Sequence, residues 1–86
     1  MPRLSAFYGI VVYMYIRDHG VPHFHARHGD DEAVLDVATG DVLAGGLPRR
    51  QTSLVTDWIE LHRGEPIAAW GRASSGEPPG TIEPLP

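Results

Sequence analysis

The chain has 86 residues, which is the size of one small domain. It contains no cysteine, so disulfide bonds and thiolate metal sites are excluded, and a bound metal ion would need histidine nitrogen or oxygen ligands. The formal net charge of −4 argues against a generally basic surface that coats nucleic acid, although it leaves room for a local basic patch.

The first half of the chain predicts short strands joined by tight turns. Residues 1–9 form a lead-in segment, and the β-branched and aromatic run at 10–16 predicts the first strand. Residues 23–28 and 32–37 predict two more strands, and residues 42–44 can add a short fourth. Because each connection is too short for a parallel crossover, residues 10–44 predict an antiparallel meander of three or four strands.

Residues 48–75 predict two helices. Pro48 suits the first turn of a helix, Gly64 suits its end, and Pro66 can begin the second helix. The first helix carries one apolar stripe, made of Leu54, Val55, Trp58, Leu61 and His62. Residues 76–86 predict an extended tail. Since strands precede helices, we expect a single α+β domain over 1–86 in which both helices cover one face of the sheet.

The apolar run at 10–16 is the main hydrophobic stretch near the start of the chain. It is far shorter than the roughly 20 residues that a membrane-spanning helix needs. It also lacks a strongly charged flank and a small-residue cleavage site, so we predict no signal peptide. These observations predict a cytoplasmic protein that does not contact a membrane.

Residues 18–33 are the chemically richest part of the sequence, because they hold four of the five histidines next to acidic residues. Side chains alternate along a strand, so His23, His25 and Arg27 share one face. The aliphatic face must meet the helices, because each buried methylene contributes about 0.8 kcal/mol. The other face is then predicted to be open and to carry Tyr13, Tyr15, His23, His25, Arg27, Glu32 and Asp36.

One interpretation of this face is a metal site for a divalent ion such as zinc. His23 and His25, at positions i and i+2, point to the same side of a strand, as in many metal sites. His19 is the leading third ligand, and Asp18 and Asp36 are alternatives. The sequence has neither an HExxH helix nor a zinc-finger spacing, so the pattern alone does not identify the metal.

A second interpretation is metal-free acid–base chemistry on RNA, with His23, His25 and Tyr15 as catalytic groups. Arg27 could bind phosphate, and Tyr13, His19 and Asp18 could contact the substrate. The acidic balance of the chain counts against RNA. A third interpretation needs no catalysis, because a small sheet with an open face is a docking surface for a protein. The sequence leaves open whether the protein is an enzyme, or whether this face is simply solvated.

These residues, taken together, resemble a family of small bacterial proteins catalogued as domain-of-unknown-function family 4160. The most specific element is Asp18-His19 followed by Pro22-His23-Phe24-His25-Ala26. The resemblance covers nearly the whole chain, and its other elements are Met1-Pro2, Phe7 to Ile10, Met14-Tyr15, Glu32-Ala33, Gly40, Leu47-Pro48, Trp58, Leu61-His62, Trp70 and Ile82-Glu83-Pro84-Leu85. Val21, Arg27 and His28 depart from the family pattern, so His28 has the weakest claim to a family function.

The resemblance implies a gene arrangement similar to a toxin–antitoxin pair, and therefore a protein partner encoded by a neighbouring gene. Self-association is the alternative, because a domain of this size has a small core. We therefore expect one component of a two-gene module whose histidine-rich sheet face is its active or docking surface. The alternative expectation is a small metal-binding protein that uses His19, His23 and His25.

Overall fold

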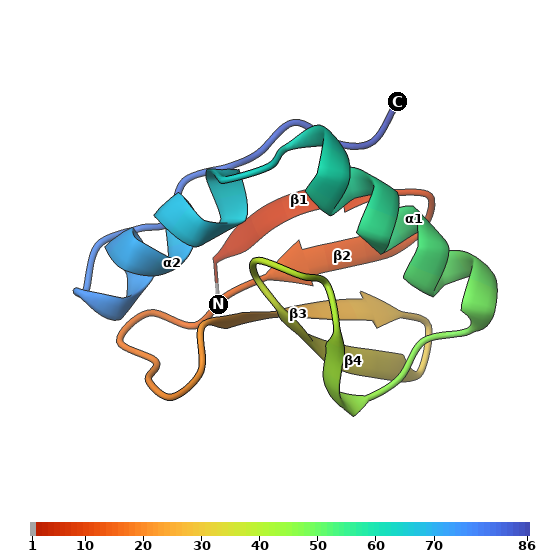
Figure 1. Cartoon of the computed structure of the whole chain (residues 1–86), viewed down its shortest axis with the longest axis horizontal. Helices are drawn as coiled ribbons and strands as arrows, with labels where there is room; N and C mark the ends of the chain where they lie inside the picture. Colours follow the sequence, from red (N-terminus) through yellow and green to blue (C-terminus); the bar gives the residue numbers. More distant parts are fainter. Residues whose placement is uncertain (1) are drawn as a thin grey trace.

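The computed structural model describes residues 2–86; Met1, the first residue of the predicted lead-in segment, lies outside the described residues. Five strands form one antiparallel sheet in sequence order, and two helices follow them (Figure 1). The predicted α+β class and antiparallel meander are confirmed. The elements are β1 (Arg3–Phe7), β2 (Ile10–Tyr13), β3 (His23–His28), β4 (Asp31–Asp36), β5 (Val42–Gly45), α1 (Arg49–Leu61) and α2 (Glu65–Ser74).

The sheet has more strands than predicted, because the lead-in segment itself forms β1. This strand pairs with β2 through a two-residue turn at Tyr8 and Gly9. Both turn residues have positive φ angles, 50° and 77°, as the tight turns of β-hairpins often require. Asparagine or aspartate usually precedes the glycine in such turns, so Tyr8-Gly9 gave no clear hairpin signal in the sequence.

Trp58 of α1 lies at the centre of the core between the helix and the sheet. Its side chain is fully buried, and its ring centroid lies 5.7 Å from that of Phe7 and 5.9 Å from that of Phe24. The indole Nε1–H donates a 2.9 Å hydrogen bond to the carbonyl of Glu83. One side chain therefore joins the first helix, two strands and the C-terminal tail.

The predicted packing of Leu61 against the sheet is wrong. Leu61 is 55% exposed, whereas Ile59, outside the predicted stripe, is only 6% exposed. The side chains that α1 buries are Val55, Trp58 and Ile59. At 100° per residue, Leu61 lies about 120° around the helix from Val55, on the flank of this stripe.

Helix α2 covers one end of the sheet and the tail covers part of its β1 edge, whereas the β5 edge is exposed. Helix α2 lies at the end of the sheet where β3 begins and buries Ala69 and Ala73 (Figure 1). The N–H of Ile82, in the tail, donates a 2.7 Å hydrogen bond to the carbonyl of Leu4 in β1. The outer edge of β1 is therefore partly occupied. In the part of the chain that is described, neither helix is long and apolar enough to cross a membrane.

Replacing Trp58 with alanine should lower the free energy of unfolding by about 3–5 kcal/mol, because the change removes a fully buried aromatic ring. Urea denaturation followed by far-UV circular dichroism measures this value. Leu61→Ala in the same helix is the matched control and should change stability by less than about 0.5 kcal/mol, because that side chain is exposed. Equal effects of the two substitutions would contradict this description of the core.

Candidate functional site

The candidate site lies on the face of the sheet opposite α1. The strand register places Tyr13 of β2 opposite His25 of β3 and places His23 opposite Asp36 of β4. His23 and His25 are two residues apart on one strand, so both rings lie on this face, with centroids 5.3 Å apart. Side chains from adjacent strands of the sheet therefore meet on this face.

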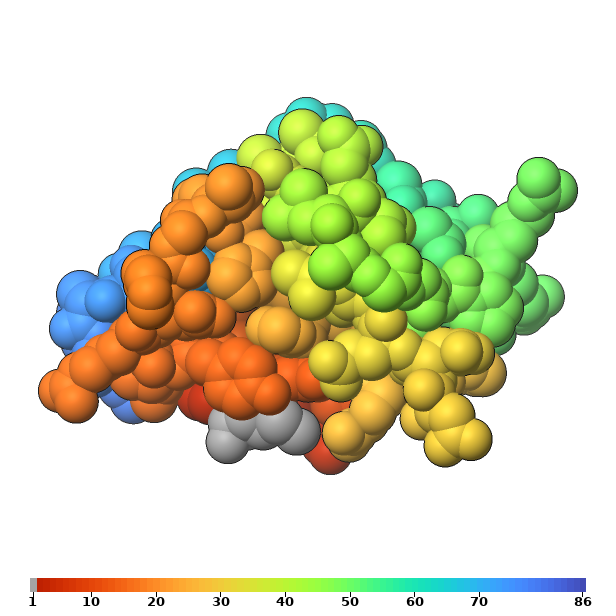
Figure 2. Space-filling model, turned by 90° about the horizontal axis from the view of Figure 1, so that it is seen from below, coloured from red at the N-terminus to blue at the C-terminus, as the bar shows by residue number. Residues whose placement is uncertain are grey.

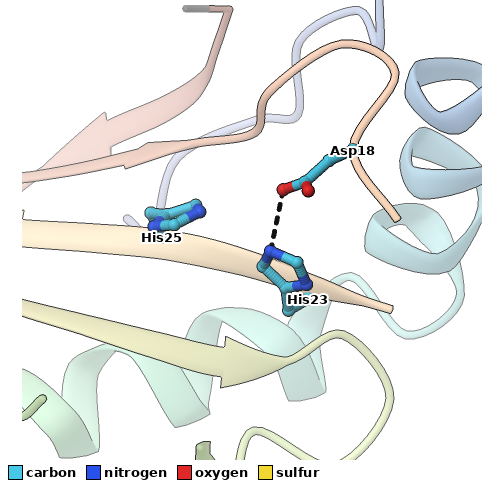
Figure 3. A group of neighbouring side chains, drawn as sticks. All are labelled: Asp18, His23 and His25. Atoms are coloured by element: carbon cyan, nitrogen blue, oxygen red, sulfur yellow. Dashed lines mark ion pairs between the residues drawn. The ribbon is translucent and has the colours of Figure 1, made fainter. Parts of the chain in front are cut away.

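The loop between β2 and β3 brings Asp18 back over the beginning of β3. The main-chain N–H of Arg17 donates a 2.7 Å hydrogen bond to Ala73 at the end of α2, and Arg17 itself has a positive φ of 63°. This turn aims the Asp18 carboxylate at the sheet, where its Oδ2 lies 2.9 Å from Nε2 of His23 (Figure 3). The main-chain N–H of His19 donates to the other oxygen of Asp18.

Asp18, His23 and His25 form a three-residue cluster with the composition of a metal site. Each residue offers one ligand atom, and these three atoms all lie within 4.8 Å of one another. Ligands around a tetrahedral zinc ion, bound at 2.0–2.2 Å, are about 3.3 Å apart. The Asp18–His23 pair is therefore already near its liganding distance, and a modest approach of His25 would complete the set.

The rings of this site are held by aromatic contacts. His25 stacks on Tyr13 with centroids 5.0 Å apart and an interplanar angle of 13°. Tyr15 meets the His25 ring edge-on at 4.9 Å, and Trp70 of α2 lies 4.9 Å from the His23 ring. Figure 2 shows this side of the sheet, seen from below relative to Figure 1, with the orange loop after β2 on one side and the yellow-green β5 segment on the other.

The hydrogen bonds of His23 direct one of its nitrogens toward Asp18. Nδ1 lies 2.6 Å from the carbonyl of Val21, and it must be the donor because a carbonyl oxygen only accepts. Nε2 is then the nitrogen that faces Asp18, at 2.9 Å. This division of roles is typical of a metal-binding histidine, in which one ring nitrogen is anchored by the protein.

His25 differs from His23, because neither of its ring nitrogens has a hydrogen-bond partner among residues 2–86. Its side chain is only 13% exposed. Burial lowers the pKa of His25, and the neighbouring His23 lowers it further, although the carboxylates of Glu32 and Asp18 partly oppose this change. The ring is therefore neutral near pH 7, and neutral imidazole is the form that binds metal ions.

The polar face is more covered than the sequence predicted. Tyr13 is 2% exposed, because His25 stacks on its ring and its hydroxyl donates to Glu32. Burial raises the pKa of Tyr13, and the hydrogen bond to Glu32 raises it further. Arg27, an exposed residue, has its guanidinium carbon 6.0 Å from the centroid of the same ring. Stacked side chains thus cover the centre of the face that we expected to be open.

The other predicted residues lie around or away from the three-residue cluster. Tyr15 is 44% exposed, and His19 is exposed in the loop, so both lie at the rim of the site. The carboxylate of Asp36 accepts hydrogen bonds from the main-chain N–H groups of Ala38 and Thr39, which makes it a turn residue. His28 lies beside the β1–β2 turn, where its ring would be 3.5 Å from a Cβ added at Gly9.

In buffer with EDTA, the protein should become less stable as the pH falls below 6.5, the ordinary histidine value. The unfolded chain binds a proton at His25 where the folded chain does not, so acid favours unfolding. This contribution to stability is complete above 6.5 and is lost between 6.5 and the lowered pKa of the folded state. Urea denaturation at a series of pH values measures it. His25→Phe, which keeps a ring against Tyr13, should give a flatter profile; identical profiles would contradict the assignment.

Comparison with known proteins places the chain in a family. Residues 9–71 match the family described as a domain of unknown function, DUF4160. The matched region runs from the β1–β2 turn into α2 and contains Asp18, His23 and His25. Searches of curated proteins and of solved structures gave no match. Since the match covers most of the chain and the whole candidate site, the protein belongs to the DUF4160 family.

Proposed function

We propose that this protein binds a divalent metal ion through Asp18, His23 and His25. The observation that carries the proposal is the pair of buried, unpartnered ring nitrogens of His25, next to an aspartate–histidine pair at 2.9 Å. Buried polar groups are normally hydrogen-bonded, and each exception needs an explanation. A metal ion between the three side chains would supply the missing partner for one of these nitrogens.

Zinc is the ion that best suits this ligand set. Two histidines and one carboxylate are a known zinc combination, and they leave one tetrahedral position open for water or another ligand. When bound, such an ion would lower the pKa of a coordinated water and so supply a hydroxide near neutral pH. The same set also suits non-haem Fe(II), so the test should determine the native metal as well as the zinc affinity.

Protein purified without a histidine tag should carry a stoichiometric divalent metal, measured by inductively coupled plasma mass spectrometry. After chelation, calorimetric titration with zinc should give one site per chain. Asp18→Asn, His23→Ala and His25→Ala should each weaken binding by more than the 10–100-fold that loss of an outer-shell partner costs. A wild-type protein that binds neither zinc nor iron would end this proposal.

Two further histidine variants make the test specific. His28→Ala is the matched control and should bind zinc as the wild type does, because this ring lies beside the β1–β2 turn. His19→Ala compares this ligand set with the set predicted from the sequence, in which His19 is the third ligand. Zinc binding that persists in His19→Ala but not in Asp18→Asn supports the aspartate as the ligand.

We also propose that the protein is one component of a toxin–antitoxin-like two-gene module in bacteria and that its partner protein docks on β5. This strand is exposed along its whole length, with Val42 43% and Leu43 48% exposed. It forms the edge of the sheet opposite β1, and no charged residue occurs between Asp41 and Arg49. Exposed edge strands offer main-chain groups for pairing with another chain, and the bulge near Leu43 only partly protects this one.

Co-expression with the neighbouring gene should yield a complex that copurifies through a tag on the neighbour's product. Leu43→Lys should abolish the complex, because it puts a charge on the edge strand. Leu61→Lys is the matched control, a similarly exposed leucine on α1, and should leave the complex intact. Sedimentation of the protein alone separates a dimer from a monomer. No complex with the neighbour, or copurification of RNA instead, would contradict this docking proposal.

A further inference from the structure

Glu32 of β4 lies beside the proposed metal ligands without being one of them. Its Oε2 is 3.9 Å from Nδ1 of His25, and its Oε1 accepts a hydrogen bond from the hydroxyl of Tyr13. Tyr13, His25 and Glu32 come from β2, β3 and β4, which are adjacent in the sheet. The carboxylate is therefore fixed on one side by a buried tyrosine and faces the histidine on the other.

This arrangement assigns different roles to the two nitrogens of the His25 ring. Since Nδ1 faces Glu32, Nε2 is left for the side of Asp18 and His23. Figure 3 agrees with this division, because one ring nitrogen of His25 is turned toward these two side chains and the other is turned away. The 3.9 Å separation is about 1 Å longer than a hydrogen bond, so a small rotation of the Glu32 side chain would complete one.

We propose that Glu32 is a positioning residue that prepares His25 for the metal ion. Its carboxylate accepts the Nδ1–H of His25, which fixes the tautomer whose Nε2 lone pair faces Asp18 and His23. The Tyr13 hydroxyl, by donating to the same carboxylate, holds Glu32 in place. Histidine ligands commonly donate their second ring N–H to such a carboxylate, and its loss typically reduces metal affinity 10–100-fold. This inference rests on the proposed metal-binding function.

The first experiment tests the tautomer without any metal. In EDTA-treated protein at pH 8, the imidazole ¹⁵N chemical shifts of His25 should report a proton on Nδ1. Glu32→Gln should shift the population toward the Nε2–H tautomer, since the amide N–H₂ can now donate to Nδ1. Asp31→Asn removes the same charge from the opposite face of β4 and should leave the shifts unchanged. A wild-type His25 protonated on Nε2 would overturn the inference.

The second experiment measures zinc affinity in a double-mutant cycle. Glu32→Gln should bind zinc about 10–100-fold more weakly than the wild type, and Asp31→Asn should not. If Glu32 acts through His25, its substitution in a His25→Ala background should cause no further loss. An equal loss in both backgrounds would show that Glu32 acts by charge alone, and an unaffected affinity would exclude any role; both results overturn the inference.

Controls keep the two proposals separate. Glu32 is 44% exposed, so its glutamine variant should fold, and thermal melts of each variant verify this. Absence of zinc binding by the wild type would refute the metal site itself. If the wild type binds zinc and Glu32→Gln binds it equally well, only the role of Glu32 is refuted.

Discussion

The burial of one indole ring is the contact on which this small domain depends. A chain of 86 residues buries a limited fraction of its surface, so few side chains can contribute much to its stability. Trp58 contacts Phe7 and Phe24 and bonds to the tail at Glu83, so strands, helix and tail share one centre. Helix α1 covers one face of the sheet, and strand alternation therefore places histidines and tyrosines together on the other face.

The second face of the sheet is covered by packed aromatic and imidazole rings and not by a second layer of helices. Tyr13 and His25 stack, Tyr15 contacts the His25 ring edge-on, and Trp70 of α2 contacts His23 at the end of the sheet. This packing removes water from His25 but provides no partner for its nitrogens within residues 2–86. The same contacts that stabilise the face therefore create the unsatisfied nitrogens that support a metal-binding proposal.

Local sequence patterns predicted the meander, the two helices and the shared face of His23 and His25, because strand and helix periodicity and turn residues are local signals. They did not predict β1, whose Tyr8-Gly9 turn lacks the usual residues. Nor did they favour Asp18 over His19, because the approach of Asp18 depends on the left-handed conformation of Arg17, which is uncommon for a residue other than glycine. The contact between Trp70 and His23 depends on the docking of α2, which no local pattern determines.

The hydrogen bond from Ile82 to Leu4 has a consequence for how the chain folds during synthesis. The strand pairings in this sheet join strands that are consecutive in the sequence. Most of them can form early, because closing short loops costs little entropy. The outer edge of β1 receives this partner, however, only after residue 82 has been made, and the indole of Trp58 must likewise wait for Glu83. A nascent chain that already contains all five strands and both helices therefore still lacks the last contacts of its core, so we expect cooperative folding of this domain to be completed only after residues 82 and 83 have been synthesised.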